Sequence, residues 1–258
     1  MNKPSTKKLN YRVFGNGHPV VFLHGFLESM TMWEELELIG EWQYVFIDLA
    51  GHGDSELIGE VISMQSMAFQ VNEILDELSI ESCHLVAHSM GGYVALELLK
   101  ITPRIEKLVM LNSNFWSDDK QKRLERERVA SIVMKNKSLF IYEVIPNLFI
   151  DPVEKNEHVV QLINEANKMA ADDIAKISIA MSQRIDNISL VKDRRESILI
   201  VQGEKDTVVP FSRMKKLADL YNLECVVIPE TGHMIHIEDA ESLTKEIGHF
   251  FSSTSTVQ

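Results

Sequence analysis

A serine, an aspartate and a histidine each follow an apolar run of the kind that forms a buried strand. They are Ser89, Asp206 and His233, in that order along the chain. A serine hydroxyl is a weak nucleophile unless a base takes its proton, and the base needs an acid that orients it and stabilises its cation. The residue types and their order after three strands therefore predict acyl-transfer chemistry.

The segment around Ser89 is typical of a nucleophile elbow, a tight turn between a strand and a helix that leaves the serine oxygen exposed. Gly91 and Gly92 provide the small neighbours that such a turn needs on the helix side. Ala87 stands where the G-x-S-x-G pattern has its first glycine, and we expect its added methyl group to be tolerated. The alternative interpretation of Ser89 is an ordinary helix N-cap.

Asp206 and His233 also have alternative interpretations, because each precedes a predicted helix and could cap it. The set as a whole favours catalysis, since three residue types of one catalytic set follow three strands in the order of a single fold. His236 is the rival base, and we prefer His233 because its loop position and the preceding Gly232 let it reach the elbow. If Asp206 were not the acid, Asp118 would be the nearest candidate.

Other polar residues near these motifs are expected to be structural. His24 and His52 should form structural hydrogen bonds, because neither follows the last strand. His88 precedes the candidate nucleophile on its strand, so its side chain should point away from the site. Asp48 and Asp54 belong to the loop after another strand and are also predicted to be structural.

Strands and helices alternate over most of the chain, which predicts an α/β fold with a mostly parallel sheet and helices on both faces. Apolar runs predict strands at 9–14, 19–23, 43–49, 83–88, 107–112, 197–202 and 224–228. Apolar spacing predicts helices at 30–40, with Trp33 and Leu36 on the buried side, and at 64–78, 90–100, 211–221 and 235–251.

The alternation stops between residues 114 and 193, where amphipathic helical stretches replace buried strands. We interpret 114–193 as a helical cap inserted into a core formed by 1–113 and 194–258. One apolar stretch could roof the site or attach the cap to the core, and it consists of Leu139, Phe140, Tyr142, Val144, Ile145, Leu148 and Phe149. The cap methionines are expected to have packing roles and not to contact a ligand; they are Met134, Met169 and Met181.

The composition limits the partners and the compartment. With 258 residues, 45% of them hydrophobic, the chain can bury a substantial core. A net charge of −12 argues against a nucleic acid partner. No signal peptide or membrane span is recognisable, so the expected location is cytoplasmic. Cys83 and Cys225 lie in predicted buried strands, which indicates free thiols and neither a disulfide nor a metal site.

These motifs resemble those of the α/β-hydrolase-fold serine hydrolases, in the capped branch that includes esterases, lipases and proline-iminopeptidase-like enzymes. The resemblance covers nearly the whole chain, and its motifs are residues 24–26, 48–55 (D-x-x-G-H-G-x-S), 88–92, 203–206 and 232–233. It implies Ser89 as nucleophile, His233 as base and Asp206 as acid. It also implies an oxyanion hole formed by the amides of Phe26 and Met90, and no cofactor. Relatives that use aspartate as nucleophile, the haloalkane dehalogenases and epoxide hydrolases, are disfavoured by the serine.

The predicted function is hydrolysis of a carboxylic ester, with an apolar acyl part, through an acyl-enzyme. A first alternative is the elimination step of menaquinone biosynthesis on the same triad, for which Arg123, Arg126 and Arg128 could bind substrate carboxylates. Their alternation with Glu125 and Glu127 favours a solvated helix face instead. A second alternative is a ligand sensor of this fold with slow turnover, which a complete triad disfavours.

Overall fold

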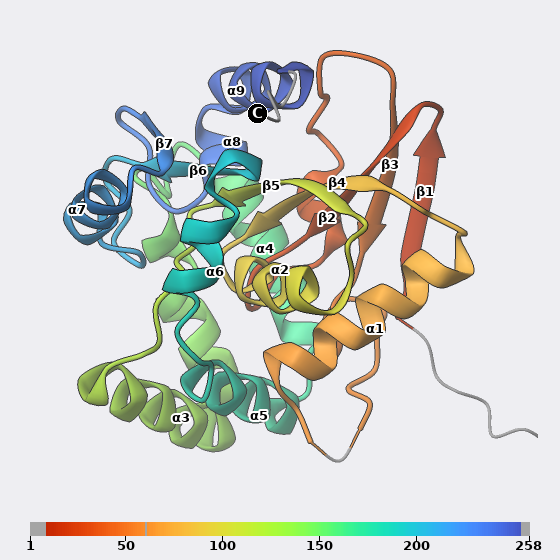
Figure 1. Ribbon diagram of the computed structural model, residues 1–258. Helices are drawn as coiled ribbons and strands as arrows, with labels where there is room; N and C mark the ends of the chain where they lie inside the picture. The colour runs from red at the N-terminus through yellow and green to blue at the C-terminus, as the bar shows by residue number, and fades with distance from the viewer. Residues whose placement is uncertain (1–8, 60, 254–258) are drawn as a thin grey trace, which may run out of the picture.

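Figure 1 shows the computed structural model, which describes residues 9–59 and 61–253. The described residues form one seven-stranded sheet in the order β1-β3-β2-β4-β5-β6-β7. Neighbouring strands pair in parallel, except that β1 is antiparallel to β3. The strands are β1 (Tyr11–Gly15), β2 (His18–Leu23), β3 (Trp42–Ile47), β4 (Cys83–His88), β5 (Ile105–Leu111), β6 (Ile198–Gly203) and β7 (Glu224–Ile228). The predicted α/β fold with a mostly parallel sheet is confirmed.

Helices cover both faces of the sheet, with α1 and α2 on one face and α9 on the other (Figure 1). The α-helices are α1 (Met64–Glu77), α2 (Met90–Ile101), α3 (Lys120–Val144), α4 (Asn156–Lys168), α5 (Ala171–Ser182), α6 (Ile188–Asp193), α7 (Phe211–Tyr221), α8 (Ile235–Glu238) and α9 (Ala240–Ser252). The short 3₁₀ segments are η1 (Met30–Trp33), η2 (Pro146–Leu148) and η3 (Arg195–Ser197). Within residues 9–59 and 61–253, none of the helices combines the length and apolar character needed to cross a bilayer.

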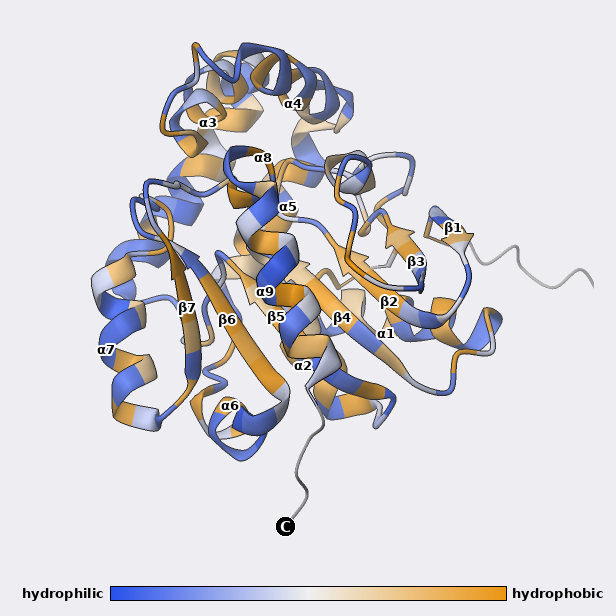
Figure 2. Cartoon of the chain, turned by 90° about the horizontal axis from the view of Figure 1, so that it is seen from above, coloured by the Kyte–Doolittle hydropathy of each residue, from blue (hydrophilic) through white to orange (hydrophobic). Residues whose placement is uncertain are grey.

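The central strands are buried on both faces because each face carries a separate set of apolar side chains. On β2, Val21 and Leu23 belong to the cluster that includes α1 and α2, whereas Val20 and Phe22 belong to the cluster that includes α9. Figure 2 shows the result as hydrophobic colour along the central strands, while outer helices such as α7 alternate between hydrophilic and hydrophobic residues. This two-sided burial fixes the register of the strands and the positions of the loops at their ends.

The structure differs from the predicted helix at 30–40, because only η1 is helical in that segment. Beyond η1 the backbone finds a partner outside any helix, since the Leu38 N–H donates to the Tyr44 hydroxyl at 2.9 Å. Trp33 and Leu36 are nevertheless buried, as predicted. The apolar spacing therefore identified the buried residues correctly but the wrong backbone conformation.

Two smaller differences concern the end of the chain. The predicted helix at 235–251 is divided at Asp239, whose backbone is non-helical and whose side chain caps α9 by accepting the Ser242 N–H at 3.1 Å. Cys83 is buried, as predicted. Cys225 is only half-buried, because it lies on β7, the edge strand of the sheet. Both thiols are free.

Helices α3 to α6 lie between β5 and β6 in the chain, and α3 and α4 lie beyond one end of the sheet (Figure 2). α3 is kinked at Asn136, where φ is −156° and ψ is 81°. It packs against α5, and the Ser178 hydroxyl donates to the Arg126 carbonyl at 3.1 Å. These helices occupy the segment in which we predict a cap, and the boundaries at 114 and 193 stay a prediction.

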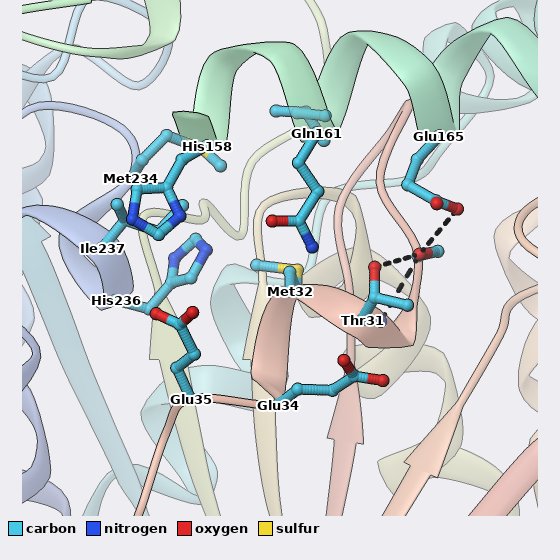
Figure 3. A pocket seen from close by; sticks show the side chains of 12 residues that line it. Thr31, Met32, Glu34, Glu35, His158, Gln161, Glu165, Met234, His236 and Ile237 are labelled. Atoms are coloured by element: carbon cyan, nitrogen blue, oxygen red, sulfur yellow. Dashed lines mark hydrogen bonds between the residues drawn. The ribbon is translucent and has the colours of Figure 1, made fainter. Parts of the chain in front are cut away.

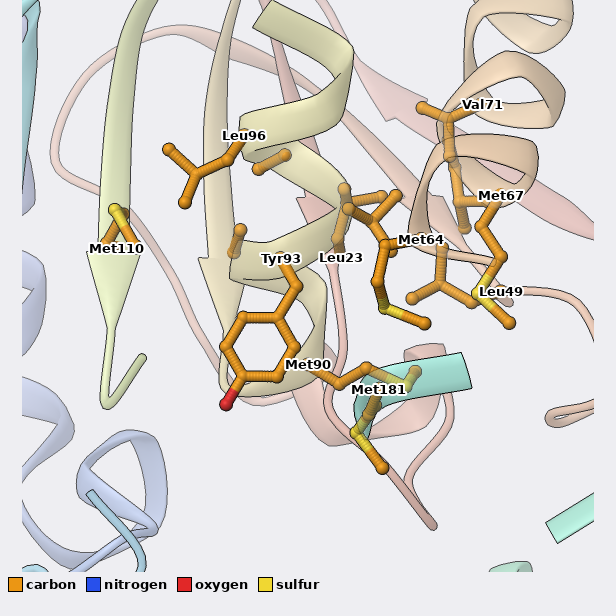
Figure 4. Close-up of a cluster of buried hydrophobic side chains, with 14 of the residues drawn as sticks. Leu23, Leu49, Met64, Met67, Val71, Met90, Tyr93, Leu96, Met110 and Met181 are labelled. Carbon is orange, nitrogen blue, oxygen red and sulfur yellow. The ribbon is translucent and has the colours of Figure 1, made fainter. Parts of the chain in front are cut away.

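Methionines fill the interior between α1, α2 and α5 (Figure 4). Met64, Met90 and Met181 belong to the same buried cluster, and the unbranched side chain of methionine suits the irregular space between helices. Met169 is also buried, as expected for a packing role. Met134 is 58% exposed, so the expected packing role was wrong for this residue.

Candidate active site

The three residues singled out in the sequence meet at the carboxyl edge of the sheet, because each follows the end of a parallel strand. The His233 Nε2 lies 3.0 Å from the Ser89 Oγ, and the His233 Nδ1 lies 2.9 Å from the Asp206 Oδ2. The side chains of His233 and Asp206 are 3% and 0% exposed. An ionised carboxylate only accepts hydrogen bonds, so Nδ1 carries the proton and Nε2 is free to accept one from the serine.

Ser89 occupies a strained turn between β4 and α2. Its φ of 48° and ψ of −113° are unusual for a residue with a side chain. The turn is held by the Ser89 N–H, which donates to the Leu111 carbonyl at 3.0 Å, and by the Ser113 hydroxyl, which donates to the Ser89 carbonyl at 2.6 Å. Ser89 stands at the N-cap position of α2, but its side chain makes no capping hydrogen bond to a described residue. Its oxygen faces His233 instead.

The glycines after Ser89 are required by close packing. A Cβ on Gly91 would lie 2.5 Å from the Leu23 carbonyl oxygen, and one on Gly92 would lie 2.2 Å from the Ser113 Oγ. Ala87, which replaces the first glycine of the usual pattern, is fully buried within the sheet. The turn therefore accommodates a methyl group on the strand side and none on the helix side.

Asp206 is held by hydrogen bonds to both of its oxygens. Oδ1 accepts the N–H groups of Val208 and Val209, at 2.7 and 3.1 Å. Oδ2 accepts from His233 and also from the side-chain amides of Asn112 and Gln202, at 2.7 and 3.0 Å. Burial raises the pKa of Asp206, but the charge of His233 and these hydrogen bonds lower it to about 2. The carboxylate is therefore ionised at neutral pH.

Asn112 and Gln202 were missed in the sequence, although both are polar residues at the end of an apolar strand. Asn112 has a φ of 45° and donates a second hydrogen bond to the Gly232 carbonyl at 2.9 Å. It therefore connects Asp206 with the loop that carries His233. A polar side chain that ends a buried strand is the signal that could have identified both residues.

A buried ion pair lies behind His233. His88 Nδ1 donates to the Glu28 carboxylate at 2.9 Å, and His88 Nε2 donates to the His233 carbonyl at 2.9 Å. Burial alone would lower the pKa of His88, but the charge of Glu28 outweighs it and the pKa is raised. Burial alone would raise the pKa of Glu28, but the charge of His88 lowers it to about 2. Glu28 also accepts the Gly25 N–H. The pair thus connects the loop after β2 with the His233 loop. Glu28 was not among the residues predicted from the sequence.

His24 and Asp48, which lie in two of the other motif loops, have structural roles, as expected. His24 Nε2 accepts the Leu49 N–H at 2.9 Å, and its Nδ1 donates to the Gly25 carbonyl at 2.7 Å. Asp48 accepts the N–H groups of Met30 and Asp54, at 2.8 and 3.0 Å. These bonds connect the loops that follow β2 and β3, and they fix the loop in which Phe26 lies.

The proposed oxyanion hole involves the amides of Phe26 and Met90. Met90 is the first residue of α2, so its N–H belongs to the first turn and has no carbonyl acceptor within the helix. Phe26 follows Gly25, whose N–H is anchored by Glu28. This placement is compatible with two N–H donors beside Ser89, and their role stays a proposal.

The segment between α3 and α4 supports the His233 loop directly. The His233 N–H donates to the Leu148 carbonyl at 3.1 Å. The Glu238 carboxylate accepts the N–H groups of Ile150 and Gly232, at 2.6 and 2.7 Å. Movement of this segment would therefore change the position of His233.

Neither rival residue joins Ser89. His236 is buried, and its ring lies 5.4 Å from Trp33; within residues 9–59 and 61–253, neither of its ring nitrogens has a hydrogen-bond partner. Asp118, the alternative acid, is paired with Arg184 at 2.7 Å and with Arg126 at 3.4 Å. His233 and Asp206 are thus the histidine and carboxylate that the structure brings to the serine.

A pocket lies between α4 and the segment that begins with η1, next to the His233 loop (Figure 3). His158, Gln161 and Glu165 project into it from α4, and His236 faces it from α8. The Ser29 hydroxyl reaches across to the Glu165 carboxylate at 3.4 Å. The pocket is therefore polar on the α4 side.

We expect the protein to lose stability as the pH falls from 7 to 5. Burial lowers the pKa of His52 and His236 to about 3, whereas the pKa of an unfolded histidine is about 6.5. Between these values the unfolded chain binds protons that the folded protein does not bind, so stability decreases as the pH falls below 6.5. Each histidine contributes about 1.4 kcal/mol per pH unit once its unfolded form is protonated.

Urea unfolding curves at pH 7, 6 and 5 measure this dependence. The His236→Gln variant lacks one of these proton-binding groups. The slope of its unfolding free energy against pH should therefore be smaller by about 1.4 kcal/mol per pH unit, which corresponds to one proton. A slope equal to that of the wild type would show that His236 is not held neutral by burial.

Comparisons with known proteins show which proteins this chain is similar to. An esterase from Thermogutta terrifontis has a solved structure that matches with a TM-score of 0.87 and 28% identity, over 96% of this chain and 94% of that chain. The pimeloyl-[acyl-carrier protein] methyl ester esterase of Aeromonas hydrophila is 27% identical over 250 residues, which are 92% of this chain and 96% of that protein.

A longer protein is also similar. The dihydrolipoyllysine-residue acetyltransferase component of the acetoin cleaving system of Pseudomonas putida is 27% identical over 240 residues. The match covers 90% of this chain but only 62% of the length of that protein. The profile of the alpha/beta hydrolase family matches residues 20–246, which is most of the chain. The chain therefore belongs to the alpha/beta hydrolase family.

Proposed function

We propose that the protein is a serine hydrolase that cleaves carboxylic esters through an acyl-enzyme. The observation that carries the proposal is the continuous hydrogen-bonded chain from the Ser89 Oγ through His233 to Asp206. Two of the similar proteins are esterases, which favours an ester over other acyl compounds.

In the proposed reaction, His233 Nε2 takes the proton of Ser89 while the serine oxygen attacks the ester carbonyl. The amides of Phe26 and Met90 stabilise the oxyanion of the tetrahedral intermediate. The C–O bond then breaks, and His233 gives its proton to the departing alcohol. Water repeats the sequence on the acyl-enzyme and releases the acid, with Asp206 stabilising the protonated histidine in both steps.

An apolar acyl part of the substrate is a further part of the proposal. The apolar stretch that suggested it is divided in the structure: Phe140 and Ile145 are buried, whereas Leu139 and Tyr142 are 52% and 59% exposed. The buried residues belong to the same hydrophobic cluster as α2, so they help to attach α3 to the core. The test of an apolar acyl part is therefore the turnover of esters of graded acyl length.

The elimination reaction is less well supported. Its substrate carboxylates would need free arginines, but the Arg126 Nε donates to the Asp118 carboxylate at 3.4 Å, and the Arg123 Nε donates to the Asp118 backbone carbonyl at 3.1 Å. Arg128 is exposed on α3, which fits the alternative interpretation as a solvated helix face. Esters therefore remain the better candidates.

Turnover of p-nitrophenyl esters of graded acyl length, measured beside p-nitroanilides and a substrate of the menaquinone-pathway elimination, tests the proposal. We expect ester hydrolysis to be fastest and to vary with acyl length. Turnover of the elimination substrate without ester hydrolysis would identify a lyase. Saturable ester binding without turnover would identify a sensor.

Replacing Asp206 by asparagine should reduce kcat by about 10²- to 10⁴-fold. The asparagine has no charge to stabilise protonated His233, and its amide nitrogen must face N–H donors whichever way it turns. We therefore also expect a loss of about 1–3 kcal/mol in stability.

The matched control is Asp239→Asn, because Asp239 is a helix cap and asparagine caps about as well as aspartate. The kcat and the melting temperature are measured for both variants and compared. If Asp206→Asn behaved like the control, Asp206 would be a loop residue without a role in turnover.

A further inference from the structure

A second group of polar side chains lies at the edge of the sheet opposite Ser89, where the parallel strands begin. His18 is the first residue of β2, and His84 and Glu106 are the second residues of β4 and β5. The ligand atoms of these three side chains lie within 4.8 Å of one another, and no other such group of three occurs among residues 9–59 and 61–253. Since β2, β4 and β5 are neighbours, the sheet itself fixes the spacing.

An irregularity in the strand pairing brings Glu106 into this group. Cys83 pairs with Ile105 and His84 pairs with Lys107, so Glu106 is the extra residue of a bulge in β5. Bulges redirect side chains, and the Glu106 carboxylate is directed at both histidines. Its Oε2 lies 3.3 Å from the His18 Nε2 and 3.7 Å from the His84 Nδ1.

The two ring nitrogens that face Glu106 are buried, and neither forms a hydrogen bond with any described residue. His84 as a whole is 6% exposed. Buried polar atoms normally have a partner, so these nitrogens point to a ligand that both can bind.

We propose that His18, His84 and Glu106 bind a divalent transition-metal ion, for which Zn²⁺ is the best fit. Two imidazoles and one carboxylate are a ligand set that Zn²⁺ accepts, whereas Ca²⁺ and Mg²⁺ prefer oxygen ligands alone. Tetrahedral bonds of about 2.0–2.2 Å separate the ligand atoms by about 3.4 Å. The distances from Glu106 Oε2 to the two nitrogens, 3.3 and 3.7 Å, are close to this value.

The surroundings hold the ligands close to the protein surface. The ring of His84 packs against Phe251 and Trp42, with centroids 4.4 and 5.8 Å apart. The side chains of His18 and Glu106 are 32% and 48% exposed, so the group lies close to the protein surface although the two ring nitrogens themselves are buried. The bound ion would connect the starts of three strands and stabilise the fold.

Lys107 is the cation closest in sequence to this group, and its ammonium is directed elsewhere. It donates to the carbonyls of Phe250 and Phe251 at the end of α9, at 2.6 and 3.3 Å. Those carbonyl oxygens offset its charge, which would otherwise oppose a bound cation.

Calorimetric titration of the untagged, metal-free protein with ZnCl₂ tests the proposal. We expect one Zn²⁺ per chain, and binding about tenfold or more weaker in Glu106→Gln and in His18→Gln. Both replaced residues are partly exposed and the substitutions keep their size, so both variants should fold. The matched control is His158→Gln, which removes a half-buried histidine from the pocket beside α4 and should leave Zn²⁺ binding unchanged.

Thermal melting gives an independent result. Zn²⁺ should raise the Tm of the wild type and of His158→Gln but not of the two cluster variants. Ester hydrolysis should be the same with and without EDTA, since the group lies at the other edge of the sheet from Ser89. The proposal is wrong if the wild type shows no stoichiometric binding, if the cluster variants bind Zn²⁺ as tightly as the wild type, or if His158→Gln alone abolishes binding.

Discussion

Ser89→Ala should reduce kcat for ester hydrolysis by about 10⁶-fold and leave the fold intact. The hydroxyl is hydrogen-bonded to His233 but makes no capping hydrogen bond to a described residue, so its loss removes the nucleophile without removing a helix cap. The strained backbone at Ser89 is held by neighbouring hydrogen bonds that alanine preserves. Initial rates and a circular dichroism melting curve measure the two parts of this expectation.

Ser113→Ala is the matched control for this variant. It removes a hydroxyl that donates to the Ser89 carbonyl at 2.6 Å but leaves the nucleophile in place. We expect a much smaller loss of kcat than in Ser89→Ala. If the two variants lost activity equally, or if Ser89→Ala kept its turnover, Ser89 would not be the nucleophile.

His233→Ala should reduce kcat by about 10³-fold or more, whereas His236→Ala should have a small effect on kcat. His233 is hydrogen-bonded to both Ser89 and Asp206, while His236 packs against Trp33. His236→Ala should instead lower the Tm, because it leaves a cavity beside a fully buried tryptophan.

Steady-state kinetics and thermal melting of both histidine variants separate catalysis from stability. The reverse ranking of the two kcat values would make His236 the base. Equal losses of kcat with equal losses of Tm would show only that both histidines support the fold.

The sheet and the three candidate residues could be predicted because each depends on local patterns. Ser89, Asp206 and His233 each follow an apolar run, and parallel strands end at the same edge. The glycines after Ser89 were also recognisable, since a tight turn needs small neighbours. The end of a strand can be recognised from the local sequence alone, without information on distant contacts, so residues placed there can be predicted.

Features that depend on distant contacts could not be predicted. Glu28 and His88 are 60 residues apart and meet only because β2 and β4 are neighbours. A nearer contact also overrides a local pattern: the segment at 30–40 has helical apolar spacing, but the Leu38 N–H donates to the Tyr44 hydroxyl six residues later. The distribution of buried and exposed residues along α3 depends on its packing against α5, which apolar content alone does not fix.

The group at the opposite edge of the sheet shows the same limitation. His18, His84 and Glu106 are far apart in sequence, and no short motif connects them. Glu106 reaches the histidines because a bulge shifts the pairing of β4 with β5. No pattern in the sequence predicts this bulge. The expectation of no metal site rested on the cysteines and did not consider these residues.

The central claim is that His233 and Asp206 make Ser89 a nucleophile. Reaction with a fluorophosphonate followed by mass spectrometry of the intact protein and of its peptides tests it most directly, because such probes phosphonylate activated serines. We predict one added group per chain, on the peptide that contains Ser89, with no labelling of Ser89→Ala and slow labelling of His233→Ala. Full labelling of Ser89→Ala, or a group attached to any other residue, would contradict it.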